Sequence, residues 1–150
     1  MTVNEFWQEF LVKSNKDSTT QYFECFYFAS TEEWANKLLE LVLLGKKKAT
    51  TSSLPAYEKS EEKLPQVGDY SIVTDWDGNP RCVIETTAVV ILPFNEMTFD
   101  ICKCEGEDDT LESWRRGHMA HFLEEGKTLG YEFSETMPVV FEDFKVVYVI

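Results

Sequence analysis

The chain is poor in positive charge and has no long hydrophobic run. Its 150 residues include 14 Lys and Arg against 27 Asp and Glu, so the formal net charge is −13 at pH 7. A chain this acidic repels long polyanions, and non-specific binding to duplex nucleic acid depends on neutralising phosphates. The longest apolar runs, at Leu38–Leu44 and Ala88–Phe94, fall far short of the ~20 residues that a membrane helix needs. The sequence therefore predicts a cytoplasmic protein that binds neither duplex DNA nor a membrane.

Cysteine is scarce and irregularly spaced. The chain has four cysteines, none of them in a C-x-x-C pair: Cys25, Cys82, Cys102 and Cys104. Paired cysteines at the C-x-x-C spacing are a common sign of a structural zinc site, and a spacing of one residue is too tight for one. We expect four reduced thiols, because free cysteine commonly behaves as a small buried hydrophobe.

Motifs for cofactor and nucleophile chemistry are also missing. The chain contains neither the G-x-x-x-x-G-K-[ST] phosphate loop nor the G-x-S-x-G nucleophile elbow. His118, His121 and Glu125 lie close in sequence, but no Cys or further His completes a clear set of metal ligands. We therefore predict no cofactor and no metal site.

The residues that are present fit one folded domain, 1–150. A chain of this length can bury roughly 70% of the surface that it exposes when unfolded. A content of 43% hydrophobic and 14% aromatic residues is typical of a packed core. The sequence predicts an α+β fold with about six strands and three helices, in which short antiparallel strands form a small barrel and the helices pack outside it.

Capping signals and periodicity place the predicted elements. Helices are expected over residues 3–13 with a Thr2 and Glu5 capping box, from Ser30 to Gly45, and from Asp109 to Gly126 or Gly130. Extended segments are expected over residues 22–28, 46–53, 70–74, 81–92, 99–104 and 139–150. Asp77-Gly78 predicts a hairpin turn, and residues 55–65 read as a surface excursion.

One segment differs from the acidic background. Lys46, Lys47 and Lys48 follow the predicted helix end at Gly45 and precede hydroxyl residues at 50–53. In an extended chain Lys46 and Lys48 would point to one side and Lys47 to the other. One interpretation is a solvated charge run, favoured by the negative end of the helix dipole. The other is a ligand-binding turn.

The pattern G-x-K-x-x-T is formed by Gly45, Lys47 and Thr50, and with it the chain resembles the ASCH domain family. The resemblance covers most of the chain. It includes residues 65–69 (PQVGD), the strand with Glu85, residues 111–118 (LESWRRGH) and residues 138–148 (PVVFEDFKVVY). This ordered set is more specific than the six-residue motif alone.

The resemblance implies a PUA-like mixed or antiparallel β-barrel with a cleft beside the G-x-K-x-x-T turn. Relatives are regarded as RNA-binding modules. One small bacterial branch resembles an amidohydrolase that removes acetyl from acetylcytidine, and another has been linked to ribonuclease activity. In the amidohydrolase branch the working residues are the motif Lys, the motif Thr and a strand Glu, which correspond to Lys47, Thr50 and Glu85.

These three residues form a chemically consistent set. The Thr50 hydroxyl is a weak nucleophile and needs a base, which a lysine such as Lys47 supplies only in its neutral form. A protonated Glu85 could donate a proton to the leaving amine. The alternative for Glu85 is a structural salt bridge to Lys47.

Further residues are predicted to bind the substrate: Gly45, Lys46 and Ser52 near the motif, and Trp114, Arg115 and His118 on the third helix. Trp114 and His118 are one helical turn apart. An indole can stack on a base, and Arg or His can bind phosphate. The alternative is a core Trp with a hydrogen-bonded His.

Three functions remain open at this point. The preferred hypothesis is an amidohydrolase acting on an acylated nucleoside, and the alternatives are a non-catalytic RNA- or nucleotide-binding module and a ribonuclease. The charge of −13 disfavours long RNA. The expected partner is therefore a small-molecule nucleoside or a short single-stranded RNA.

Any binding of single-stranded RNA should be weak and should fall with salt, because clustered positive charge is confined to Lys46–Lys48 and Arg115–Arg116. Titration of a labelled oligonucleotide at two salt concentrations measures this. Tight binding that salt does not change would contradict the small-substrate hypothesis.

Overall fold

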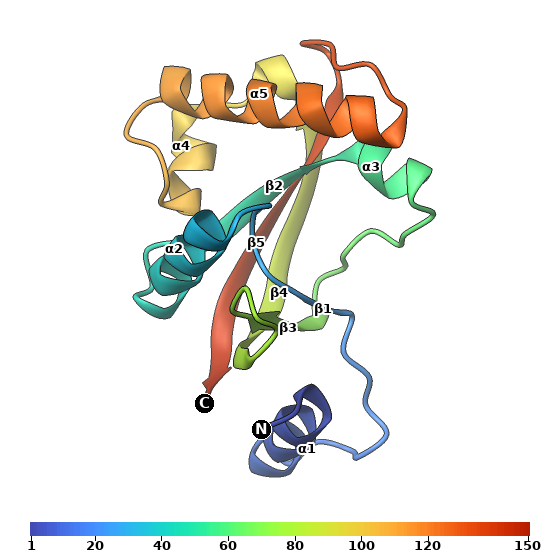
Figure 1. Ribbon diagram of the computed structural model, residues 1–150, viewed down its shortest axis with the longest axis vertical. Helices are drawn as coiled ribbons and strands as arrows, with labels where there is room; N and C mark the ends of the chain where they lie inside the picture. Colours follow the sequence, from blue (N-terminus) through green and yellow to red (C-terminus); the bar gives the residue numbers. More distant parts are fainter. The chain divides into compact units, whose positions relative to one another are not determined.

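The computed structural model describes all of residues 1–150 (Figure 1). Its helices are α1 Val3–Lys13, α2 Glu32–Leu43, α3 Leu54–Lys59, α4 Phe99–Cys102 and α5 Leu111–Leu129. Its strands are β1 Glu24–Phe26, β2 Ala49–Ser53, β3 Tyr70–Thr74, β4 Pro80–Pro93 and β5 Pro138–Val149. Two 3₁₀ turns are also present, η1 Phe94–Glu96 and η2 Lys103–Glu105. None of the helices combines the length and the apolar character that crossing a membrane requires.

The strands form one mixed sheet in the order β1-β3-β4-β5-β2. β1 runs parallel to β3, whereas β3 is antiparallel to β4 and β2 is antiparallel to β5. The predicted α+β class is confirmed. The chain divides into two compact units: unit 1 is Met1–Lys46, Val67–Thr87 and Phe144–Ile150, and unit 2 is Lys47–Gln66 and Ala88–Asp143.

Unit 1 is packed from two apolar clusters. The predicted capping box of Thr2 and Glu5 is present at the start of α1. The buried face of α1 packs on β3 and β4 through Phe6, Trp7, Phe10, Leu11, Ile72 and Val83. The buried face of α2 forms the second cluster through Leu38, Leu39, Val42, Val73, Cys82, Ile84, Phe28 and Phe144.

The end of α2 explains the glycine of the G-x-K-x-x-T motif. The Gly45 N–H donates to the Val42 carbonyl oxygen at 3.0 Å, and the Lys46 N–H donates to the Leu41 carbonyl oxygen at 2.9 Å. These are the two hydrogen bonds of a Schellman motif, which requires a left-handed residue at the reversal. Gly45 has a φ of 76°, so its predicted role at the helix end is confirmed.

Unit 2 is built around α5. Trp114 and Phe122 of this helix are fully buried and pack with Phe94, Met137 and Phe141. α3 and α4 both contact α5 (Figure 1). The whole of β2 lies in this unit. Unit 2 therefore contains both the motif side chains from position 47 onward and α5, the helix predicted to bind substrate.

Two helices begin one residue later than predicted. Thr31 caps α2 in place of Ser30, and Thr110 caps α5 in place of Asp109. In each segment two adjacent side chains are able to cap the helix, and spacing alone does not choose between them.

Residues 99–104 are helical and not a strand. Thr98 caps α4 by accepting the Ile101 N–H, and η2 follows directly. A segment this short has no useful periodicity, so its cap decides the structure. Residues 54–59 likewise form α3, with Pro55 in the first turn, where a missing N–H has little consequence. The chain thus has five strands and five helices where about six and three were predicted.

α5 continues through Gly126 and ends at Gly130, which has a φ of 87°. Gly126 is helical, and a Cβ at this position would lie 2.4 Å from the Tyr131 carbonyl oxygen. This glycine is therefore needed for the close approach of the chain after the helix, and not for ending the helix itself.

Gly45→Ala should lower the free energy of unfolding by about 1–2 kcal/mol, because a Cβ is disfavoured in the left-handed region. Gly117→Ala is the matched control, since Gly117 is helical and a Cβ there would meet nothing within 4 Å. The control should raise stability by up to about 1 kcal/mol. Urea unfolding of both variants measures the difference, and an equal effect would contradict the assigned role of Gly45.

Candidate functional site

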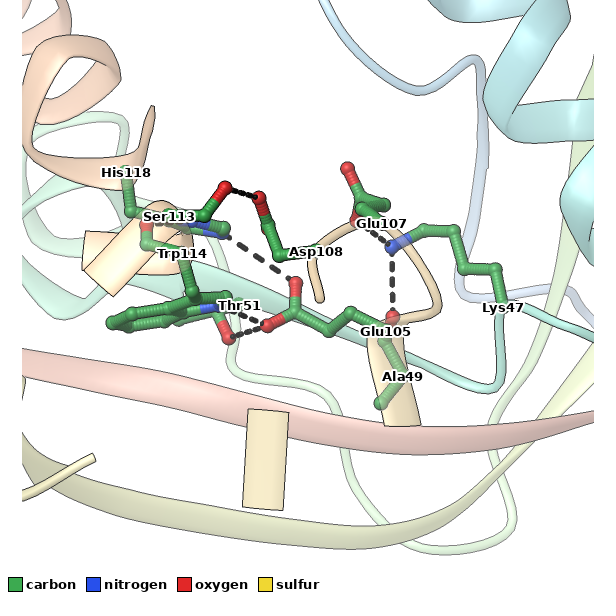
Figure 2. A network of polar contacts seen from close by, with 9 residues as sticks. All are labelled: Lys47, Ala49, Thr51, Glu105, Glu107, Asp108, Ser113, Trp114 and His118. Atoms are coloured by element: carbon green, nitrogen blue, oxygen red, sulfur yellow. Dashed lines mark hydrogen bonds and ion pairs between the residues drawn. The ribbon is translucent and has the colours of Figure 1, made fainter. Parts of the chain in front are cut away.

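Lys47 is a buried cation with partners inside unit 2 (Figure 2). Its Nζ donates to the Ala49 carbonyl oxygen at 2.8 Å and to Glu107 Oε2 at 2.7 Å. The Lys47 side chain is 1% exposed and that of Glu107 is 21% exposed. A buried ammonium group needs a compensating charge, which a charge-assisted hydrogen bond of this length supplies. Lys47 is therefore not part of a solvated surface run.

The neighbouring lysines have a different environment. Lys46 and Lys48 are exposed, so the solvated-charge interpretation describes these two residues. The Lys48 backbone N–H donates to the Cys104 carbonyl oxygen at 2.8 Å, which ties the start of β2 to η2. This tie brings Lys47 to the loop that carries Glu107.

The hydroxyl residues of β2 lie on two faces. Thr51 Oγ1 donates to Glu105 Oε2 at 3.0 Å, on the face that also carries the buried Ala49. Because side chains alternate along a strand, Thr50 and Ser52 lie on the opposite face. Both are half-buried. The motif threonine and the predicted binding residue Ser52 therefore share one face of β2.

Glu105 is a buried carboxylate that joins three segments. The residue is 1% exposed. Its Oε2 accepts from Thr51 Oγ1 and from Trp114 Nε1, and its Oε1 lies 3.5 Å from His118 Nε2 (Figure 2). The partners come from β2 and from two successive turns of α5, and Glu105 itself ends η2.

These contacts shift two pKa values in opposite directions. Burial alone would raise the pKa of Glu105, but the hydrogen bond and charge of His118, with the Lys47 charge and the Trp114 indole, hold that pKa below its ordinary 4.5. Burial alone would lower the pKa of His118, but the hydrogen bond and charge of Glu105 help to raise that pKa above its ordinary 6.5. Between these two pKa values the favoured state is an ionised Glu105 beside a protonated His118.

The α5 residues predicted to bind substrate differ in exposure. Trp114 is 0% exposed, and its ring stacks on Phe94 and on His118 at centroid distances of 5.4 and 4.2 Å. This is the arrangement of a core Trp with a hydrogen-bonded His, and it leaves no ring face open to a base. Arg115 is exposed, and its guanidinium donates to the Asn95 carbonyl oxygen at 3.4 Å.

Glu85 lies in unit 1, on β4 and opposite Tyr70 of β3. Gly45 and Lys46 also belong to unit 1, whereas Lys47 and Thr50 belong to unit 2. The carboxylate that the contacts of unit 2 bring to Lys47 is that of Glu107. The role of Glu85 as a proton donor stays a prediction.

Sequence reasoning missed Glu105 and Glu107, because it treated residues 105–109 only as an acidic loop. A signal was present, since a lysine that becomes buried needs a carboxylate and this loop is the acidic run before the third predicted helix. The pattern does not show which carboxylates turn inward. Gly106, with a φ of 70°, separates the two glutamates.

Comparison with known proteins gives the fold and the family. The model of the ASCH domain matches residues 24–148. The crystal structure of a protein from Enterococcus faecalis V583 matches with a TM-score of 0.91 and 36% identity, over 98% of this chain and 88% of that chain. The ASCH domain from Lactobacillus crispatus JV V101 matches with a TM-score of 0.86 and 37% identity, over 99% of this chain and 96% of that chain. No protein with curated annotation matches the chain.

A mutant ASCH protein from Zymomonas mobilis matches with a TM-score of 0.50 and 11% identity, over 85% of this chain and 73% of that chain. At this identity the likeness concerns the fold alone. Together the matches define an α+β protein with the barrel-like, PUA-like fold, as predicted. The chain belongs to the ASCH domain family.

The Glu105–His118 pair should make stability depend on pH. Folding raises the pKa of His118, so its contribution is complete below about 6.5 and is lost as the pH rises through the higher folded value. Folding lowers the pKa of Glu105, so its contribution is present above about 4.5 and is lost as the pH falls through the lower folded value. Urea unfolding across this range should show the loss on both sides.

His118→Gln should remove the loss of stability on the alkaline side of the pH profile. Glu105→Gln leaves the imidazolium uncompensated and should lower the free energy of unfolding by about 3–5 kcal/mol where His118 is protonated. A wild-type profile that matches that of His118→Gln would contradict the assigned pair.

Proposed function

We propose that the chain is a small amidohydrolase that removes the acyl group from an acylated, acetylcytidine-like nucleoside. The observation that carries the proposal is the buried Lys47–Glu107 pair at 2.7 Å, three residues before Thr50 of β2. A lysine, its carboxylate partner and a hydroxyl three residues further along the chain supply the groups that can move protons during amide cleavage. The association of the ASCH family with RNA binding supports a nucleoside as the substrate class.

The proposed steps balance in protons. Lys47 passes one proton to Glu107, and the neutral amine then takes the proton of Thr50 as Thr50 Oγ attacks the acyl carbon. The leaving amine takes its proton from Glu107 as the C–N bond breaks. Water then hydrolyses the ester on Thr50, which releases the carboxylic acid and restores the hydroxyl. In this scheme Glu107 takes the donor role that was predicted for Glu85.

The charge of the chain supports a small substrate. An uncharged nucleoside meets no repulsion from a net charge of −13, whereas a long RNA does. Ser52 lies on the same face of β2 as Thr50, and Arg115 is exposed. These two residues stay proposed substrate-binding residues, as do Gly45 and Lys46 of the motif segment.

A non-catalytic module that binds a nucleoside or short RNA is the second candidate. Lys47 Nζ already donates to a carbonyl and to a carboxylate. An ammonium group engaged in this way acts as a donor and not as a base. This alternative predicts affinity for a nucleoside without turnover.

Lys47→Ala, Thr50→Ala and Glu107→Gln should each lower the turnover of acetylcytidine by roughly 10²–10⁴-fold, the usual loss for an acid–base group. Chromatography of the released cytidine measures the rate. Glu85→Gln, assayed in parallel, separates the two carboxylates. If Glu85→Gln loses the activity and Glu107→Gln keeps it, the donor is Glu85.

Lys48→Ala is the matched control, because it removes the same charge from an exposed neighbour and should leave turnover little changed. A wild type that binds cytidine derivatives without deacylating acetylcytidine would favour the binding module. A wild type that does neither would overturn both candidates.

A further inference from the structure

Two carboxylates, at the end of η2 and in the loop that follows it, each pair with a basic side chain. Glu107 pairs with Lys47 at 2.7 Å, and Glu105 lies 3.5 Å from His118 (Figure 2). Only Gly106 separates the two glutamates. With His118 protonated the four charges cancel, whereas with His118 neutral Lys47 alone balances two carboxylates. The state of His118 therefore matters to a pair that it does not touch.

Both ring nitrogens of His118 face acceptors. Nδ1 lies 3.0 Å from the Trp114 carbonyl oxygen, and Nε2 lies 3.5 Å from Glu105 Oε1. A neutral imidazole has one N–H and can donate to only one of them, whereas the imidazolium donates to both. The side chain is 16% exposed, so water replaces a lost contact poorly. The geometry selects the charged ring.

The loop is anchored on both sides of Glu107. On one side Glu105 accepts from Thr51 Oγ1 and Trp114 Nε1, and on the other Asp108 accepts from Ser113 Oγ at 2.7 Å. Of these anchors, only Glu105 also reaches β2, at the residue directly after Thr50. The Glu105 carboxylate therefore fixes the backbone close to Glu107 and close to Thr50.

We propose that Glu105 and His118 are positioning residues of the site: Glu105 holds the 105–109 loop to Thr51 of β2, and its ion pair with His118 clamps the loop to α5 and thereby sets Glu107 on Lys47. When His118 loses its proton, one side of the clamp is released. The Lys47–Glu107 pair is then tight at pH values where His118 is charged and loosens as His118 becomes neutral. For its effect on catalysis the inference rests on the proposed function, but its structural content does not.

The surrounding charges act in the same direction as the clamp. The Lys47 charge favours an ionised Glu105, and the Glu107 charge favours a protonated His118. Asp108 is the other acidic residue of the loop with a described contact, to Ser113 of α5. The coupling between the two ion pairs is therefore reciprocal, and each pair stabilises the other.

Nuclear magnetic resonance of the full chain tests the proposal without substrate. At a pH where His118 is charged, the Lys47 ammonium should give a slowly exchanging ¹⁵N signal, because it is buried and paired. As the pH rises, the ¹⁵N chemical shift of the Lys47 ammonium and its rate of exchange with water should change. Both changes should have the same midpoint as the titration of the His118 ring. In His118→Gln the exchange at the lower pH should be faster by on the order of tenfold, and the pH-linked change should be absent.

His121→Gln is the matched control. His121 lies three residues further along α5 and 3.5 Å from Glu125 Oε2, but its side chain is 55% exposed. This variant should leave the Lys47 signal as in the wild type. A wild-type Lys47 signal that does not follow the His118 titration overturns the proposal, and this measurement needs no variant to fold.

The outcomes for the two proposals are separable. A lack of acetylcytidine turnover would overturn the proposed function, while the resonance of Lys47 would still decide the clamp. Where turnover is measured, His118→Gln should lower kcat with little change in KM. KM should change little because the proposed substrate-binding residue Ser52 lies, with Thr50, on the face of β2 opposite Thr51. An unchanged kcat with an unchanged Lys47 signal would reject the positioning role.

Discussion

A lysine with 2% of its surface exposed has to be neutralised where it lies, and this requirement organises unit 2. Lys47 takes its carboxylate from Glu107, on a loop that has no helix or strand of its own. The loop is fixed by Glu105, which is also buried and therefore needs partners. Those partners come from β2 and α5, so each buried charge creates the need for the next contact.

Stability alone does not account for such an arrangement. Replacing a buried ion pair by apolar residues of similar volume is often neutral or stabilising, whereas removing one partner is costly. Unit 2 already has an apolar cluster around Trp114 and Phe122 to hold it together. The proposed amide cleavage would require a proton donor and acceptor in a fixed place, and it is therefore consistent with these buried charges.

The parts of the fold that the sequence predicted correctly have local causes. The Thr2 and Glu5 capping box, the Gly45 reversal and the β-branched run of β4 are each decided by neighbours in sequence. The errors at Ser30 and Asp109 are also local, since an adjacent threonine competes for each cap. The residues 99–104 were misassigned because a short apolar segment fits a strand and a helix equally well.

The contacts around Lys47 could not be predicted from the sequence, because they are long-range. The motif drew attention to Lys47 and Thr50, but the Lys47–Glu107 bond joins residues 60 apart and the Thr51–Glu105 bond joins residues 54 apart. No pattern of spacing shows which of several acidic residues in a loop will face a given lysine. The resemblance indicated Glu85, on a strand, as the carboxylate that acts with Lys47. The contacts within unit 2 indicate Glu107, in the loop.

The alternation of β2 places adjacent residues on different faces of the strand. Ala49, Thr51 and Ser53 are committed to the interior of unit 2, through the apolar cluster, Glu105 and Glu125. That commitment leaves Thr50 and Ser52 on the opposite face, where a hydroxyl can act without disturbing the packing. Since Thr50 is bonded directly to Thr51, the proposed scheme makes the position of the Thr50 hydroxyl depend on the buried carboxylate of Glu105, and through it on the charge of His118.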